Sequence, residues 1–268
     1  MKDMTKSTRR RWWWTLWTLL AVSAVGIALF SAEPYVVADV ERNRIPLDPE
    51  VASHYLSIAV HAIPSSLALL IGPFQFVTRF RVRYPKVHRI AGQVYMVCVV
   101  LGSIAALFAA TFSVSGFSVQ VAFFILTAAW LYTLAQAYRT IRRGEVQLHR
   151  VWMIRNYSLT FASVTLRIYL GLGVALQESY LPDLTFDDVY HASAWSSLVV
   201  NVLVAEYFIV HRLLKPLARR KRITGVTPAP TPTDRGVLVG AGGSAEDGSG
   251  TEDGVTVSSG PPGARGPE

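Results

Sequence analysis

The chain has 268 residues, of which 51% are hydrophobic and only 16% charged, with a formal net charge of +8. Its mean hydropathy is +0.33, and this composition excludes an ordinary soluble enzyme. A single cysteine, Cys98, excludes an intrachain disulfide and a thiolate metal cluster within one chain. Several uncharged runs exceed the ~20 residues needed to cross the hydrocarbon core, so the sequence predicts a polytopic membrane protein.

Hydropathy and helix-breaking residues predict an all-α membrane bundle of six transmembrane helices. Residues 1–11 form a basic cytoplasmic leader before an uncleaved first span. Residues 90–138 carry no charge and are too long for one span, so we expect them to fold back at residues 113–116, which contain serine and glycine. The predicted spans are residues 12–32, 52–77, 89–112, 117–138, 151–176 and 190–211.

The distribution of basic residues predicts the orientation of the bundle. Twenty of the 26 Lys and Arg residues lie in the leader or in residues 78–89, 139–150 and 212–222, all on one side of a six-span topology. The opposite loops are mainly acidic. The positive-inside rule therefore places both termini in the cytoplasm of a multi-pass cell-membrane protein. Anionic lipid headgroups, not nucleic acid, are the expected partners of the positive charge, and the oligomeric state stays open.

The C-terminal region changes in composition after the last span. Residues 212–222 form a basic juxtamembrane segment, and residues 223–268 are rich in Gly, Pro, Ser and Thr. Such a segment buries too little apolar surface to order itself. We therefore expect a disordered cytoplasmic tail over residues 223–268.

Three charged side chains fall inside the predicted spans. Each costs roughly 2.5–3.5 kcal/mol at membrane depth on insertion scales, so each is expected to be paired or to line a wet cavity. Arg155 and Glu206 are natural partners, although Arg155 alternatively extends to the interface. Arg167 lies farther from the cytoplasmic side. Its guanidinium is expected to face the outer interface or a bound anion, or to extend toward Glu178.

Histidines provide the candidate cofactor ligands. His88 and His149 each follow a basic loop and open a span, in the matching contexts Val-His-Arg-Ile and Leu-His-Arg-Val. Paired imidazoles on different helices are the usual axial ligands of b-type haem in a bundle. An outer pair would combine His61, or less favourably His54, with His191. Lipid phosphate, a quinone headgroup or no ligand are the alternatives for these imidazoles.

Several segments resemble a known family. They are Gly72-Pro73-Phe74-Gln75-Phe76, the run from Pro85 to Tyr95 that contains His88-Arg89, and the run from His149 to Tyr157, followed by Thr165-Leu166-Arg167. The chain resembles bacterial predicted membrane proteins grouped as domain of unknown function 2306, and more loosely it is similar to cytochrome b561-type bundles. The first resemblance implies no established activity. Its pattern falls on His61, Gly72, Pro73, His88, Arg89, Gly92, Tyr95, His149, Arg150, Trp152, Met153, Arg155 and Arg167.

Three functions follow as hypotheses. The first is haem b held by His61, His88, His149 and His191 for transmembrane electron transfer. The second is a non-redox lipid or small-molecule carrier or sensor with a polar cavity on the cytoplasmic side. The third is a membrane scaffold. No known catalytic motif indicates a reaction, so whether the chain is an enzyme stays open. The predicted cavity residues are Gln75, Arg89, Gln93, Tyr95, Arg150, Trp152, Arg155, Arg167 and Glu206.

Overall fold

A computed structural model describes residues 6–42, 48, 50–51 and 53–214. All regular elements within these residues are helical, and six helical segments are long and apolar enough to cross a membrane. The predicted all-α membrane bundle is therefore confirmed. The predicted tail over residues 223–268 lies outside the described residues.

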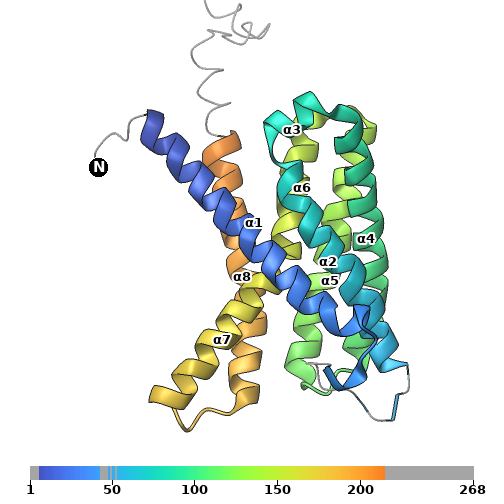
Figure 1. Ribbon diagram of the computed structural model, residues 1–268, viewed down its shortest axis with the longest axis vertical. Coiled ribbons are helices and arrows are strands. Elements are labelled where there is room, and N and C mark those ends of the chain that lie inside the picture. The colour runs from blue at the N-terminus through green and yellow to red at the C-terminus, as the bar shows by residue number, and fades with distance from the viewer. Residues whose placement is uncertain (1–5, 43–47, 49, 52, 215–268) are drawn as a thin grey trace, which may run out of the picture. The chain divides into compact units, whose positions relative to one another are not determined.

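The helices follow one another with short connections (Figure 1). A 3₁₀ turn over Val40–Arg42 follows the first helix, and a π-helical segment over Ile209–Leu214 continues the last one. The α-helices are α1 (Lys6–Val36), α2 (His54–Gln75), α3 (Thr78–Arg83), α4 (Pro85–Thr111), α5 (Phe117–Arg142), α6 (Val146–Thr160), α7 (Ala162–Tyr180) and α8 (Phe186–Phe208).

Local chemistry fixes several helix ends. Pro85 opens α4 at a position where its missing N–H is not needed. Gly116 has φ +88° in the turn between α4 and α5, which confirms the predicted reversal, and Gly144 has φ +76° after α5. Thr185 and Asp188 form a reciprocal capping box at the start of α8. These signals explain the sharp turns between the spans.

The fifth span differs from the single straight helix over 151–176 that the sequence suggested. It covers Val146–Tyr180 and is broken at Phe161 into α6 and α7. Two serine hydroxyls bond to carbonyls beside the break. Ser158 donates to Arg155 O within α6 at 2.8 Å, and Ser163 at the start of α7 donates across the break to Thr160 O at 3.1 Å. Such bonds often bend helices, and α7 leans away from the direction of α6 (Figure 1).

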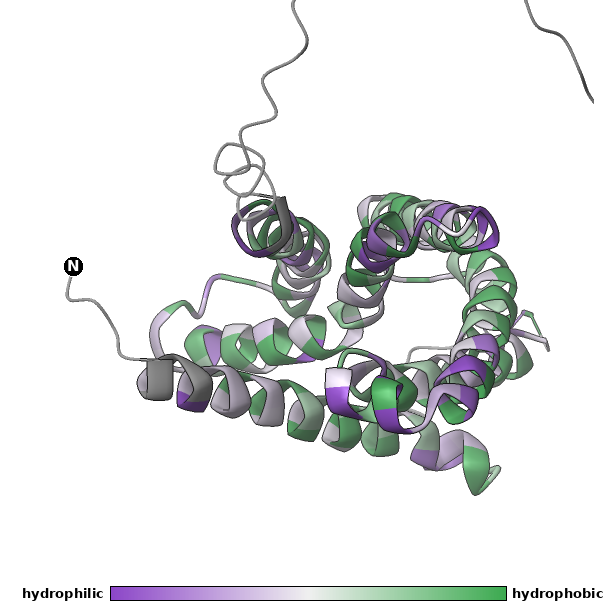
Figure 2. Cartoon of the chain, turned by 90° about the horizontal axis from the view of Figure 1, so that it is seen from above, coloured by the Kyte–Doolittle hydropathy of each residue, from purple (hydrophilic) through white to green (hydrophobic). Residues whose placement is uncertain are grey.

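Four helices form a closed ring in which α2 packs on α4, α4 on α5, α5 on α6 and α6 on α2. In this order α4 and α6 stand opposite each other. In the view from above, α1 runs lengthwise across the picture from the labelled N-terminus, whereas other helices are seen more nearly end-on (Figure 2). The core contains the buried side chains of Tyr95, Val99, Trp130, Leu134 and Tyr157. Outside the ring, α1 packs on α2, and α8 joins α7 to α5 and α6.

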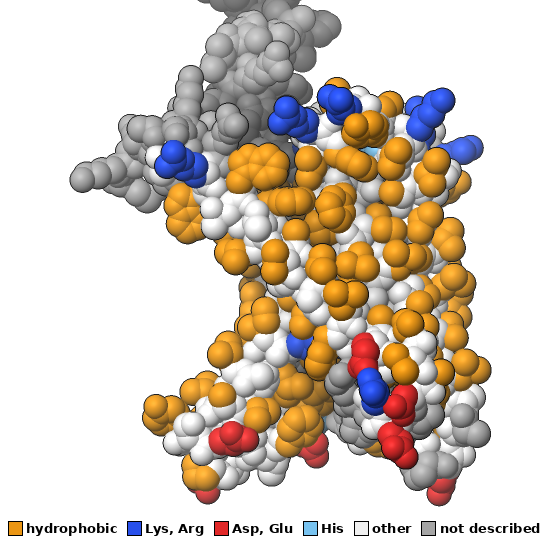
Figure 3. Space-filling view, viewed as in Figure 1, with side chains coloured by type: hydrophobic (Ala, Val, Ile, Leu, Met, Phe, Trp, Pro, Cys, Tyr) orange, Lys and Arg blue, Asp and Glu red, His pale blue; other side chains and the backbone are white. Residues whose placement is uncertain are grey.

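The surface has an apolar flank between two charged ends (Figure 3). Large hydrophobic side chains within the spans, such as Leu19, Ile104 and Leu203, are exposed by 62%, 60% and 63%, which is the surface expected of lipid contact. We call the end that carries α3 and the α5–α6 turn the basic end. The opposite end, which carries the α7–α8 turn with Asp183 and Asp187, is the acidic end.

Candidate functional site

The Gly72-Pro73 pair in α2 forms a specific junction with α6. Pro73 has no N–H, so the Leu69 carbonyl one turn earlier loses its helical partner. The Tyr157 hydroxyl donates to that carbonyl at 3.1 Å. Gly72 makes this approach possible, because a Cβ there would lie 1.9 Å from Tyr157 Cε2. Pro73 therefore leaves the Leu69 carbonyl free to accept a hydrogen bond, and Gly72 leaves room for the tyrosine ring whose hydroxyl donates it.

A buried hydrogen-bond network joins α4, α5 and α6 at the centre of the ring. Tyr95 Oη donates to Asn156 Oδ1 at 2.7 Å and lies 2.9 Å from Thr160 Oγ1, which also accepts from Trp130 Nε1 at 2.9 Å. Asn156 Nδ2 donates to Trp130 O and to Thr133 Oγ1. Tyr95 and Asn156 are 1% and 0% exposed, so these bonds form in a low-dielectric interior.

Nearer the basic end, two side chains have buried polar atoms without a described partner. Gln75 is 8% exposed, and neither its Oε1 nor its Nε2 has a hydrogen-bond partner. His88 Nδ1 is likewise buried and unpartnered. Gln75 Oε1 faces α4, 3.9 Å from the position of a Cβ on Gly92. His88 lies one turn before Gly92 on the same face of α4, so both side chains belong to the same end of the ring.

Positive groups surround this end. The charges of Arg81 and His149 act on His88, and that of Arg150 acts on Arg81. Partial burial, together with the Arg150 charge, lowers the pKa of Arg81. His149 Nδ1 lies 2.8 Å from the Ala137 carbonyl of α5, so the ring is oriented by a bond that leaves Nε2 for another partner. We call Gln75, Arg81, His88, His149 and Arg150 the basic-end site.

The two other predicted haem ligands bond to separate backbone carbonyls. His61 Nδ1 lies 2.8 Å from Gly102 O in α4, and His191 Nε2 lies 2.9 Å from Ser115 O in the α4–α5 turn. The charge of Arg167 acts on His61. Arg167 Nη1 donates to Ser163 O, one turn earlier in α7. His54 is buried and accepts from the Asp48 amide. No interaction between His61 and His191 is found among the described residues.

Arg155 and Glu206 form the predicted ion pair between α6 and α8. Arg155 Nε and Nη2 donate to Glu206 Oε1 and Oε2, at 2.5 and 3.0 Å. The guanidinium also lies over the Trp152 ring, 4.6 Å from its centroid. The pairing is confirmed, and it explains how two charges are accommodated within the membrane-spanning region.

The predicted cavity residues therefore occupy different places. Gln75 and Arg150 belong to the basic-end site, and Tyr95 to the central network. Arg89 and Gln93 are exposed on α4. Trp152, Arg155 and Glu206 lie together where α6 meets α8. Arg167 lies on α7, beyond the bend.

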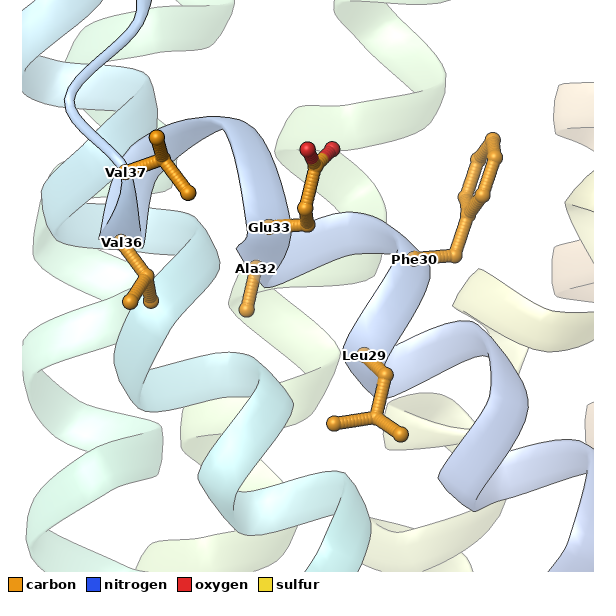
Figure 4. A pocket seen from close by; sticks show the side chains of 6 residues that line it. All are labelled: Leu29, Phe30, Ala32, Glu33, Val36 and Val37. Carbon is orange, nitrogen blue, oxygen red and sulfur yellow. The ribbon is translucent and has the colours of Figure 1, made fainter.

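A hollow with a volume of about 560 Å³ lies along the C-terminal part of α1 (Figure 4). Its lining is apolar except for Glu33, which pairs with Arg42 at 2.7 Å. The sticks in Figure 4 come from one helix, so the feature is an open groove and not an enclosed site. The lining residues are Leu29, Phe30, Ala32, Glu33, Val36 and Val37.

Sequence reasoning missed the roles of Tyr157, Trp130, Thr133 and Thr160. Tyr157 hydrogen-bonds far along the chain to Leu69, and Trp130 does so to Thr160, so no local pattern reveals either bond. The signal that was available is Asn156, an amide inside a span, because such a group is expected to find partners in the protein.

Within the described residues there is no group of three or more His, Cys, Asp or Glu side chains suited to a metal ion. Among protein families, the one described as predicted membrane protein (DUF2306) matches residues 58–209, which covers the chain from α2 to α8. No curated protein and no solved structure matches the chain.

Proposed function

The chain belongs to the DUF2306 family of predicted membrane proteins, and we propose that it binds a small polar ligand in the basic-end site. One observation carries this proposal: Gln75 is buried with both amide atoms unpartnered, at the same end of the ring as the unpartnered Nδ1 of His88. Native proteins leave few buried polar groups unsatisfied, because each costs about 1–3 kcal/mol. A ligand that bonds to these atoms offsets that cost.

The surrounding charge indicates the class of ligand. Arg81, Arg150 and two imidazoles favour an anionic group, and the Gln75 amide supplies one donor and one acceptor. Gln75 ends α2 and His88 lies in the first turn of α4, so both lie near the level of lipid headgroups. A phosphate-bearing headgroup of an anionic lipid fits this depth and charge. The protein then acts as a lipid sensor or carrier whose site faces the cytoplasm.

Thermal unfolding of the full chain in detergent tests the proposal, with dihexanoyl phosphatidylglycerol as the probe. We expect the probe to raise the melting temperature of the native protein. Gln75→Leu removes the unpartnered amide, so it should raise stability without the probe and abolish the shift with it. Gln93→Leu, at an exposed position on α4, is the control and should keep the shift. A Gln75→Leu protein that is destabilised, or that responds normally to the probe, would contradict the proposal.

Haem b is the second candidate, because His88 and His149 lie on opposite helices of the ring and close enough to interact electrostatically. The backbone bond of His149 Nδ1 is the orientation typical of an axial ligand. Absorption spectra of the same preparation, oxidised and dithionite-reduced, distinguish the two functions. Bands that His88→Ala and His149→Ala abolish, and that the exposed His211→Ala retains, would establish haem.

A further inference from the structure

The Arg155 guanidinium has donors that the ion pair with Glu206 does not use. Glu206 accepts from Nε and Nη2, while Nη1 makes no hydrogen bond to any described residue. The side chains of Arg155 and Glu206 are 28% and 40% exposed, so the pair is not enclosed by the protein. Nη1 is therefore left without a described partner in a partly exposed ion pair.

Position along the chain makes this donor unusual. At about 1.5 Å per residue, Arg155 lies about 13 Å along α6 from its start, within the segment Val146–Tyr180, which is long and apolar enough to cross a membrane. Inside a membrane-spanning segment an unsatisfied donor has little bulk water to bond with. An acceptor that dissolves in the bilayer is the natural partner at this depth.

Two aromatic rings lie beside the ion pair. Trp152 lies under the guanidinium at 4.6 Å, and Tyr132 of α5 packs edge-on against Trp152, with ring centroids 5.7 Å apart and an interplanar angle of 87°. Tyr132 is 57% exposed. A flat ligand ring therefore finds both an aromatic surface and a donor at its edge.

The charges of the ion pair favour a neutral ligand. Arg155 and Glu206 together carry no net charge, so an anion that approaches Nη1 also meets the carboxylate. A carbonyl oxygen accepts a hydrogen bond without that repulsion. We propose that Arg155 Nη1 donates to a carbonyl oxygen of a neutral, lipid-soluble quinone whose ring contacts Trp152 and Tyr132, while Glu206 holds the guanidinium in place.

This quinone site is separate from the basic-end site. Arg155 and His149 lie on the same helix, but their spacing places them on different faces of α6. Arg155 faces α8, whereas the His149 ring is held by α5. The proposal of a quinone site therefore does not depend on the proposed function.

Equilibrium dialysis of the full chain in phosphatidylcholine nanodiscs tests the site with decylubiquinone, corrected for uptake by empty nanodiscs. We expect saturable binding that decylbenzene, which has no carbonyl, and decyl acetate, which has no ring, do not displace. Trp152→Leu should raise the dissociation constant about two- to tenfold, the size expected for loss of an aromatic contact. Trp12→Leu, at an exposed tryptophan on α1, is the matched control and should bind as the native protein does.

The double variant Arg155→Gln/Glu206→Gln removes the donor without leaving a lone charge. It should lose quinone binding and still unfold cooperatively near the melting temperature of the native protein, which shows that it is folded. Binding that is unsaturable, or unchanged by both Trp152→Leu and the double variant, would overturn the proposal. So would cross-linking that places a second copy of the chain over Trp152 in the native protein.

Discussion

Gly72 is the residue whose chemistry the structure explains most completely. We expect Gly72→Ala to destabilise the protein strongly, because its Cβ would overlap the Tyr157 ring. Tyr157→Phe keeps the ring but removes the bond to Leu69 O, so it should cost about 1–3 kcal/mol, as expected for a buried carbonyl left without a donor. Unfolding titrations in mixed micelles measure both changes. Gly26→Ala is the control: nothing lies within 4 Å of that position, so it should be neutral or stabilising.

Single residues were only partly predictable from the sequence. Arg155 and Glu206 were expected to pair because charges at membrane depth need partners, and they do. The unpartnered amide of Gln75 was not predicted, since exposure of a side chain depends on which helices surround it. The sequence equally did not reveal that Gln93 is exposed whereas Gln75 is buried.

Helices α4 and α6 are held across the ring by the central network. Tyr95→Phe and Asn156→Leu each remove one end of a buried hydrogen bond, so each should destabilise the protein on its own. In the double variant both ends of this bond are gone, so neither is left without its partner. The loss of stability in the double variant should therefore be smaller than the sum of the losses in the two single variants. A double-mutant cycle in micelles measures this coupling, which we expect to be about 0.5–3 kcal/mol. Additive costs would show that the bond does not connect the two helices energetically.

At the scale of elements, the six spans and the reversal near Gly116 followed from hydropathy and turn chemistry. The break at Phe161 did not, because no proline or glycine marks it. The bend coincides with hydroxyl bonds from Ser158 and Ser163. Serine and threonine form such bonds in many straight helices, so their presence in a sequence does not predict a bend.

The charge difference between the two ends predicts the orientation of the whole bundle. With the basic end in the cytoplasm, a cysteine in place of Asp183 should react with a membrane-impermeant maleimide added to intact cells. A cysteine in place of Arg143 should react only after permeabilisation. Both positions are exposed, and the buried native Cys98 is first replaced by alanine. The reverse labelling pattern would place the basic-end site outside the cell.

At this largest scale, composition predicted the class of protein, but the ring order of α2, α4, α5 and α6 needed the structure. The sequence suggested matching contexts for His88 and His149, which is compatible with their positions on opposite helices. It did not separate the basic-end site from the cluster around Arg155. That separation depends on which face of α6 meets α8, a property of packing and not of spacing.

The contact between Gly72 and Tyr157 also limits how this family can diverge. A larger residue at the glycine position leaves no room for an aromatic ring, and another residue in place of the proline supplies the N–H that would bond to the Leu69 carbonyl within the helix. The three positions are therefore expected to change together during evolution. A related sequence that has lost the glycine but kept the tyrosine would need a different distance between its second and fifth spans.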